Sequence, residues 1–276
     1  LRQRTADGAT MTDESLTADL LLAIDVGNTS IAIGLFNGDE LAATFRIATD
    51  QDNFADEYAM LVLGLLRTTG IEQERVHSAI MSSTVPPLLA TFREVCQRYF
   101  KVEPLIVGPG IKTGIRVLYD NPREVGPDRI LHAVAALDRY EPPLVIVDLG
   151  TACVFDAVSR DGDYLGGAIA PGIGLASTAL FSRAAMLHRV SFERPDGPIG
   201  RNTAHSMQAG IFFGYVEMVR GMVNRFRAEL EETPGEATII GTGGYAHVIA
   251  DEGGCFDAIE TDLNLDGLRL VYEANQ

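Results

Sequence analysis

The chain has 276 residues, of which 46% are hydrophobic and 22% charged, a composition typical of a folded globular protein long enough for two domains. Its formal net charge is −16, and Lys101 and Lys112 are its only lysines, which argues against nucleic acid and an anionic membrane surface as the main partner. The three cysteines show no C-x-x-C spacing, so the sequence indicates neither a disulfide framework nor a zinc site.

The first 20 residues are polar and lack the charged n-region and apolar h-region of a signal peptide. We therefore expect residues 1–20 to be a flexible leader, with Met11 a candidate for the true start. No apolar run approaches the roughly 18 residues of a membrane helix. Together with the cysteine pattern, this predicts a cytoplasmic protein without a membrane partner.

The sequence motif Asp-x-Gly occurs twice, each time at the end of an apolar run. Asp25-Val26-Gly27 closes a run that begins at Leu21, and Asp148-Leu149-Gly150 closes a run that begins at Leu144. Each run predicts a buried strand, and each glycine permits a tight turn directly after the carboxylate. A carboxylate and backbone N–H groups at such a turn suit a hydrated divalent metal and the phosphate oxygens that it bridges. One copy would be weak evidence, but two copies predict a duplicated nucleotide-binding domain.

The first half predicts a β-hairpin followed by alternating helices and strands. Strands are predicted over 30–36 and 41–47, on either side of an Asn37-Gly38-Asp39 turn. The elements predicted next are a helix over 56–67, a strand over 79–83, a helix over 86–99 and a strand over 105–107. The loop that follows contains Gly108-Pro-Gly110-Ile-Lys112-Thr113, which is not a P-loop because no glycine directly precedes the lysine.

The second half, after Glu141-Pro142-Pro143, repeats this order. Its predicted elements are strands over 144–147, 154–158 and 164–170, helices over 175–187 and 206–230, a strand over 238–241 and a helix over 264–273. The sequence thus places one domain over 21–140 and a second over 141–276. Both halves resemble the sugar-kinase, actin and heat-shock ATPase superfamily. This resemblance implies an α/β fold of two duplicated ribonuclease H-like (actin-like ATPase) domains with ATP in an interdomain cleft.

Three further stretches resemble a single family. They are Tyr119-Asp-Asn-Pro122 with Gly126-Pro-Asp128-Arg129, then Gly166 to Gly172, then Ile199-Gly-Arg-Asn-Thr203. With both Asp-x-Gly turns and Thr242-Gly-Gly244, the chain from about residue 21 to 273 resembles a type III pantothenate kinase. The resemblance implies a homodimeric enzyme that transfers phosphate from ATP to pantothenate, giving 4'-phosphopantothenate in the first step of coenzyme A biosynthesis.

The resemblance also implies roles for individual residues. Asp128 matches the catalytic aspartate that deprotonates the acceptor hydroxyl, the alternative being a helix cap. Asp25 would hold Mg²⁺ through water, and Asp148 matches a position that binds potassium or ammonium. The positions matched to ATP binding are Asp25, Val26, Gly27, Asn28, Thr29, Ser30, Ile31, Ala32 and Thr151. Those matched to pantothenate are Tyr119, Gly126, Pro127, Asp128, Arg129 and Thr203, with Thr203 reaching the substrate at the homodimer interface.

Alternatives remain open for several of these residues. Arg129 is either a partner of the substrate or of the transferring phosphate, or an exposed surface arginine. Tyr119 is either a substrate contact or an ordinary packed tyrosine. Cys153 is either redox-sensitive or, as a free cysteine more often is, a small buried apolar residue. Thr242-Gly243-Gly244 resembles the superfamily's adenosine-side loop, as any glycine pair at a strand end would.

Some positions depart from the family pattern and put the reaction rate and pantothenate affinity in question. They are Asn53, Phe54, Pro127, His132 and Arg220. An alternative function is therefore a catalytically impaired homologue that acts as a binding or regulatory protein. A third is another ATPase of the superfamily, chaperone-like or filament-forming, although the Tyr119 to Arg129 block would have no role there.

Overall fold

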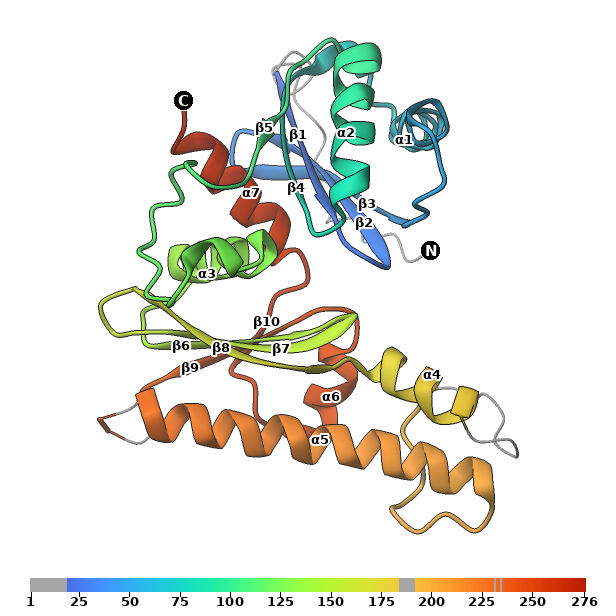
Figure 1. Cartoon of the computed structure of the whole chain (residues 1–276), viewed down its shortest axis with the longest axis vertical. Helices are drawn as coiled ribbons and strands as arrows, with labels where there is room; N and C mark the ends of the chain where they lie inside the picture. Colours follow the sequence, from blue (N-terminus) through green and yellow to red (C-terminus); the bar gives the residue numbers. More distant parts are fainter. Residues whose placement is uncertain (1–18, 184–191, 231, 234) are drawn as a thin grey trace. The chain divides into compact units, whose positions relative to one another are not determined.

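The computed structural model describes residues 19–183, 192–230, 232–233 and 235–276. The predicted leader therefore lies, up to residue 18, outside the described residues. The chain divides into two compact units, residues 1–107 and 108–276, each with one five-stranded sheet (Figure 1). Within the described parts of the chain, no helix is long and apolar enough to cross a membrane.

The first unit has strand order β3-β2-β1-β4-β5, in which β1 to β3 are antiparallel and β4 and β5 run parallel to β1. Its strands are β1 Leu20–Val26, β2 Ser30–Asn37, β3 Glu40–Ala48, β4 Val76–Ser83 and β5 Leu105–Ile106, and its α-helices are α1 Ala55–Thr69 and α2 Pro86–Val95. Alternate residues of β1, including Ile24 and Val26, share a core with Tyr58 of α1 and Phe92 of α2. Since side chains alternate along a strand, Asp25 points to the opposite face of this sheet.

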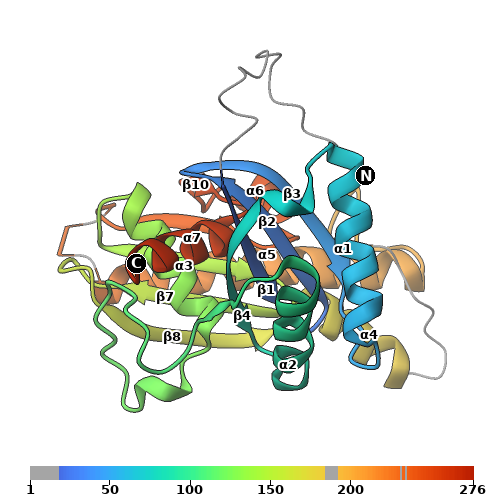
Figure 2. The same ribbon diagram turned by 90° about the horizontal axis from the view of Figure 1, so that it is seen from above.

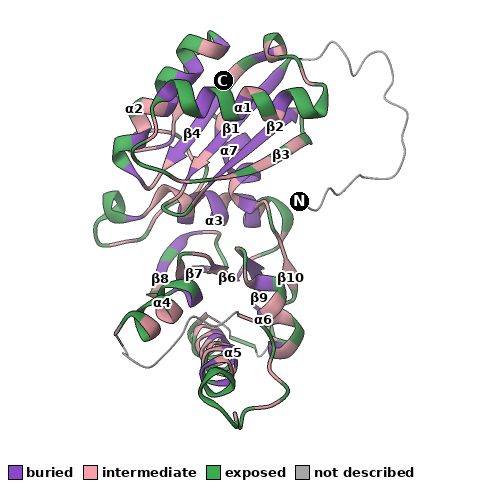
Figure 3. Ribbon diagram, turned by 90° about the vertical axis from the view of Figure 1, so that its right-hand side faces the viewer, coloured by how far each residue is buried: buried purple, intermediate pink, exposed green. Residues whose placement is uncertain are grey.

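The second unit has strand order β10-β9-β6-β7-β8. Its strands are β6 Leu144–Leu149, β7 Ala152–Val158, β8 Tyr164–Pro171, β9 Thr238–Thr242 and β10 Ala258–Ile259, and its α-helices are α3 Pro127–Arg139, α4 Ile173–Arg183, α5 Thr203–Leu230, α6 Ala246–Gly253 and α7 Leu263–Glu273. One sheet face packs on α3 and α7, which lie side by side (Figures 1 and 2), and the other packs on α5 and α6. Figure 3 shows the buried residues lining the strands of each sheet, while the outer surfaces of the helices are exposed.

The two sheets have the same topology. Read from β8, the second order is β8-β7-β6-β9-β10, three antiparallel strands followed by two strands parallel to the central one, as in the first sheet. Both predicted hairpins are present, and the first closes at Gly38, whose φ of 58° suits glycine. The prediction of a duplicated α/β fold is confirmed.

Some details differ from the sequence-based expectations. The contacts divide the chain after Val107 rather than near residue 140, because Ile130 and Ala133 of α3 pack against Leu144 and Leu263 in the core of the second unit. The sequence patterns did not predict strand β10, which has only two residues, or helix α6, which has eight. The helix predicted over 175–187 is present as α4 up to residue 183, and its last four positions lie outside the described residues.

Helix α1 begins with half of a capping box. Its N-cap residue is Phe54, whose backbone N–H donates to the Glu57 carboxylate at 2.8 Å. The reciprocal bond needs an acceptor on the N-cap side chain, and a phenyl ring, here 77% exposed, supplies none.

We predict that Phe54→Thr stabilises the protein by about 1 kcal/mol, because the threonine hydroxyl can accept from the backbone of the first turn. The measurement is the free energy of unfolding in urea. Phe54→Ala is the matched control, since it removes the exposed ring without supplying an acceptor. Equal stability of the two variants would contradict the explanation.

Candidate functional site

Asp25 lies at the carboxyl end of the central strand of the first sheet. It pairs with Ala32 of β2 on one side and with Ser82 of β4 on the other. The Ser82 hydroxyl donates a hydrogen bond to the Asp25 carboxylate, and Ser82 is itself fully buried. This bond orients the carboxylate at the edge of the β1–β2 turn.

The turn after Asp25 is held by backbone bonds. The Gly27 N–H donates to the carbonyl of Ser30 at 3.1 Å, and a Cβ on Gly27 would lie 2.9 Å from that same oxygen. The Thr49 hydroxyl donates to the Gly27 carbonyl at 2.6 Å. Only glycine fits this turn without a shift of the backbone, which explains the glycine of the first Asp-x-Gly motif.

The eight residues of the first turn that are predicted to bind ATP, Asp25 to Ala32, differ in what they can offer a ligand. The side chains of Val26, Ile31 and Ala32 are buried in the sheet, so only their backbone could face a ligand. Asn28 and Thr29 are exposed at the tip of the turn. The accessible part of the predicted loop therefore consists of these two polar residues and the half-buried Asp25, Gly27 and Ser30.

Asp148 occupies the corresponding place in the second sheet. It pairs with Val154 of β7 and with Thr242 of β9, as Asp25 pairs with Ala32 and Ser82. A Cβ added to Gly243, whose φ is 87°, would lie 2.4 Å from Asp148 Oδ1.

Gly150 also lies against the Asp148 carboxylate, since its Cβ would be 3.3 Å from Oδ1. The predicted adenosine-side loop therefore borders the carboxylate through Gly243. Thr151, at the exposed tip of the second turn, accepts from the Gly172 N–H through its carbonyl at 3.1 Å. Two glycines thus form a cradle for the carboxylate beside this turn.

Cys153 follows the second turn on the face of the sheet that packs on α5. Burial, with a smaller effect from the Asp148 charge, raises the pKa of its thiol to about 12. A thiol with such a pKa is not a thiolate near neutral pH, and the thiolate is the reactive form. The structure therefore supports the small buried apolar residue over the redox-sensitive one.

Asp128 is the second residue of α3. The N-cap of this helix is Gly126 and the first helical residue is Pro127, a position that proline favours. The alternative interpretation of Asp128 as the cap is therefore wrong. Its carboxylate folds back over the cap, since a Cβ on Gly126 would lie 2.4 Å from Asp128 Oδ1. Within the described residues, no hydrogen bond or ion pair engages this half-buried carboxylate, which leaves its oxygens available to a ligand.

Arg129 is buried, so the alternative of an exposed surface arginine is also wrong. Its Nε and Nη2 donate to Asp156 Oδ1 at 2.9 and 2.6 Å. Tyr119 lies next to it and packs its ring on β8, where a Cβ on Gly166 would be 3.0 Å from the ring carbons. The structure thus brings Tyr119, Gly126, Pro127, Asp128 and Arg129 together around the first turn of α3.

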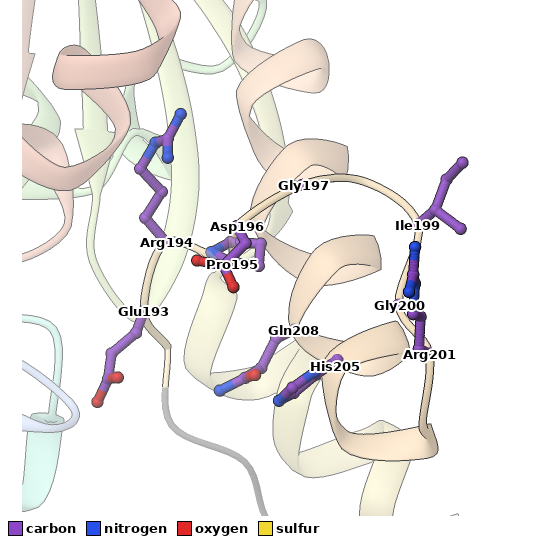
Figure 4. Close-up of a pocket in the computed structure, with 10 residues that line it drawn as sticks. All are labelled: Glu193, Arg194, Pro195, Asp196, Gly197, Ile199, Gly200, Arg201, His205 and Gln208. Atoms are coloured by element: carbon purple, nitrogen blue, oxygen red, sulfur yellow. The ribbon is translucent and has the colours of Figure 1, made fainter.

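Thr203 does not join this group within one chain. It is the exposed first residue of α5, which covers the sheet face opposite α3. The Asn202 side chain caps this helix by accepting from the His205 N–H at 2.9 Å. A pocket of about 330 Å³ is lined by residues of the 193–201 loop and by His205 and Gln208 of α5 (Figure 4).

The departures at His132 and Arg220 have structural explanations. His132 is buried in α3 and interacts with Asp156. Arg220 of α5 bonds Glu217 and donates to the carbonyls of Glu252 and Gly253 at 3.4 and 3.2 Å, which satisfies the end of α6. Neither change touches a predicted catalytic carboxylate.

Among the described residues, no three His, Cys, Asp or Glu side chains gather as a metal-binding group. A cation at Asp25 or Asp148 would therefore take its other ligands from hydroxyls, backbone carbonyls, water or ligand phosphates. Such oxygen ligands suit Mg²⁺. The donor set around each carboxylate fits a hydrated cation.

Comparison with known proteins identifies the family. The model of the type III pantothenate kinase family matches residues 21–225, and the chain belongs to this family. It is 48% identical to the type III pantothenate kinases of Geobacter sulfurreducens and Brevibacillus brevis, over 93% of this chain and 100% of each relative. The fold is similar to that of the ADPNP-bound activator of 2-hydroxyisocaproyl-CoA dehydratase from Clostridium difficile, with a TM-score of 0.51 at 10% identity over 93% of this chain and 96% of that one.

We predict that Gly243→Ala lowers the free energy of unfolding by about 1 to 3 kcal/mol, because the Cβ would meet the Asp148 carboxylate in a left-handed backbone conformation. Gly244→Ala is the matched control, since its Cβ would meet no atom within 4 Å. Thermal unfolding of both variants measures the difference. Equal destabilisation would show that Gly243 does not serve to accommodate Asp148.

Proposed function

We propose that the chain transfers the γ-phosphoryl group of ATP to the primary hydroxyl of pantothenate, giving 4'-phosphopantothenate and ADP in the first step of coenzyme A biosynthesis. Membership of the type III pantothenate kinase family supports the reaction. The observation that carries the assignment in this chain is the Asp128 carboxylate, unengaged within the described residues and gathered with Tyr119 and Arg129 at the start of α3.

In this mechanism Asp128 accepts the proton of the pantothenate hydroxyl. The hydroxyl oxygen forms a bond to the γ-phosphorus, the bond from that phosphorus to the β–γ bridging oxygen breaks, and ADP leaves. Mg²⁺, when bound, neutralises charge on the transferring phosphoryl group. Asp25 would hold it through water beside the glycine turn, and Asp148 would hold potassium or ammonium within its glycine cradle.

Further parts of the proposal concern the assembly and the compartment. We infer a cytoplasmic homodimer in which Thr203 contacts the substrate of the partner chain. The position of α5 supports this inference, because Thr203 and the Tyr119 to Arg129 group lie on opposite faces of one sheet and could serve one substrate only from two chains. Sedimentation equilibrium of the purified protein tests the dimer.

The impaired-homologue alternative is not favoured by any observation, since Asp25, Asp128 and Asp148 are all present. One assay separates it from the kinase: ADP release with ATP, Mg²⁺ and potassium, with and without pantothenate. Pantothenate-dependent release supports the kinase, and no release supports the impaired homologue. Release without pantothenate would instead indicate another ATPase of the superfamily.

We predict that Asp128→Asn lowers kcat by about 10² to 10⁴-fold, because an amide cannot accept the hydroxyl proton. Folding and ATP affinity should stay close to those of the unaltered protein, since no described hydrogen bond depends on this carboxylate. ADP release measures the rate, and circular dichroism with ATP titration provides the controls. A near-normal rate would rule out the role of Asp128 as base.

A further inference from the structure

A buried ion pair lies beneath the first turn of α3. Asp156 of β7 is 1% exposed, and its Oδ1 accepts from Arg129 Nε and Nη2 and, at 2.7 Å, from the Tyr164 hydroxyl. The Arg129 guanidinium carbon is 5.7 Å from the centre of the Tyr164 ring. Three donors on one carboxylate oxygen and a ring beneath the guanidinium leave this group little freedom of orientation.

Two adjacent glycines of β8 make room for this arrangement. Gly167 pairs with Asp156, and its Cβ would lie 1.8 Å from the Phe155 carbonyl oxygen and 3.0 Å from Asp156 Oδ1. Gly166 accommodates the Tyr119 ring in the same way. The Gly-Gly pair therefore lets a buried carboxylate and a partly exposed tyrosine flank the same arginine.

The electrostatics keep Arg129 charged. Burial acts to lower the pKa of its guanidinium, but the hydrogen bond and charge of Asp156, with smaller effects from Tyr164 and Tyr119, raise this pKa above its ordinary value. Arg129 has five N–H donors; the bonds to Asp156 use one on Nε and one on Nη2, and Tyr119 forms a further side-chain hydrogen bond with the guanidinium. These bonds do not use all five donors. A charged guanidinium held in place beside Asp128 can receive a polar or anionic group of a substrate.

The Arg129–Asp156 ion pair is not needed merely to attach α3 to the rest of the second unit. Helix α3 is also attached at its other end, where Arg139 bonds Glu260 and, at 2.6 Å, Asp266. A buried ion pair is in general weak evidence for stability, because the desolvation of both charges offsets their attraction. The pair at the first turn is distinguished by its neighbours, since it adjoins Asp128 and Tyr119.

Resting on the proposed pantothenate kinase activity, we propose that Asp156 is a positioning residue for pantothenate. Asp156 fixes the orientation of the Arg129 guanidinium, and Arg129 in turn fixes Tyr119. Both side chains are thereby held beside Asp128, where the substrate would bind. Because its carboxylate is buried, Asp156 acts through Arg129 and does not touch the substrate.

The test is the kinetics of Asp156→Asn, which keeps the side-chain volume and removes the charge. We predict that KM for pantothenate rises about tenfold or more, because Arg129 loses its charged partner, while KM for ATP changes less than about twofold. Asp266→Asn is the matched control, since it breaks the partly buried ion pair at the other end of α3. It should lower the melting temperature and leave KM for pantothenate within about twofold.

A double variant tests whether Asp156 acts through Arg129. The kcat/KM for pantothenate of Arg129→Met combined with Asp156→Asn should equal that of Arg129→Met alone. Tyr164→Phe removes one hydrogen bond to Asp156 and keeps the ion pair with Arg129. It should therefore raise KM for pantothenate by a smaller factor than Asp156→Asn does. This variant also provides the test if Asp156→Asn does not fold.

Equal effects of Asp156→Asn and Asp266→Asn on KM, or multiplicative effects in the double variant, would overturn the positioning role. If Asp156→Asn does not fold, an unchanged KM in Tyr164→Phe overturns it instead. These outcomes leave the proposed activity intact. That activity fails separately, if the unaltered protein shows no pantothenate-dependent ADP release.

Discussion

The register of the central strand in each sheet is the constraint on which the two Asp-x-Gly sites depend. Strands β1 and β6 are paired on both sides and apolar almost throughout, and the next-to-last residue of each is an aspartate flanked by the same kinds of neighbour. A slip of one residue in β1 would turn Asp25 into the core that Ile24 and Val26 occupy. The alternation of side chains along the apolar strand therefore directs the Asp25 carboxylate away from this core.

Glycine supplies the complementary constraint, because three of the four carboxylates in the proposed mechanism and positioning role lie where the Cβ of a larger residue would meet them. This holds for Gly243 against Asp148, Gly126 against Asp128 and Gly167 against Asp156. The glycines in these sequence motifs are therefore explained mainly by the close approach of a carboxylate to the backbone, and less by a need for flexibility. Such approach brings the carboxylate near backbone dipoles and keeps bulky side chains away from it.

The sequence predicted features that depend on local patterns. The hairpins, the Asp-x-Gly turns and the duplicated order follow from strand periodicity and turn residues, which act over a few positions. The partner of Arg129 depends on a contact between α3 and β7, which no local pattern encodes. One signal was available: Asp156 is a single carboxylate within the apolar strand Val154–Val158, and a buried charge requires a partner. The placement of α3 in the second unit likewise depends on packing against α7.

The attachment of α3 at both ends links the fold of the second unit to the proposed chemistry. Asp128 belongs to the first turn of a helix, whose backbone is fixed by hydrogen bonds, and the next residue is held by the buried carboxylate of β7. Pro127 restricts the backbone directly before it. If Asp128 is the base, as proposed, its backbone has little orientational freedom to lose when the substrate binds, and this would lower the entropic part of the barrier. The packing of α3 on the second sheet, rather than any loop, then determines where the Asp128 carboxylate lies.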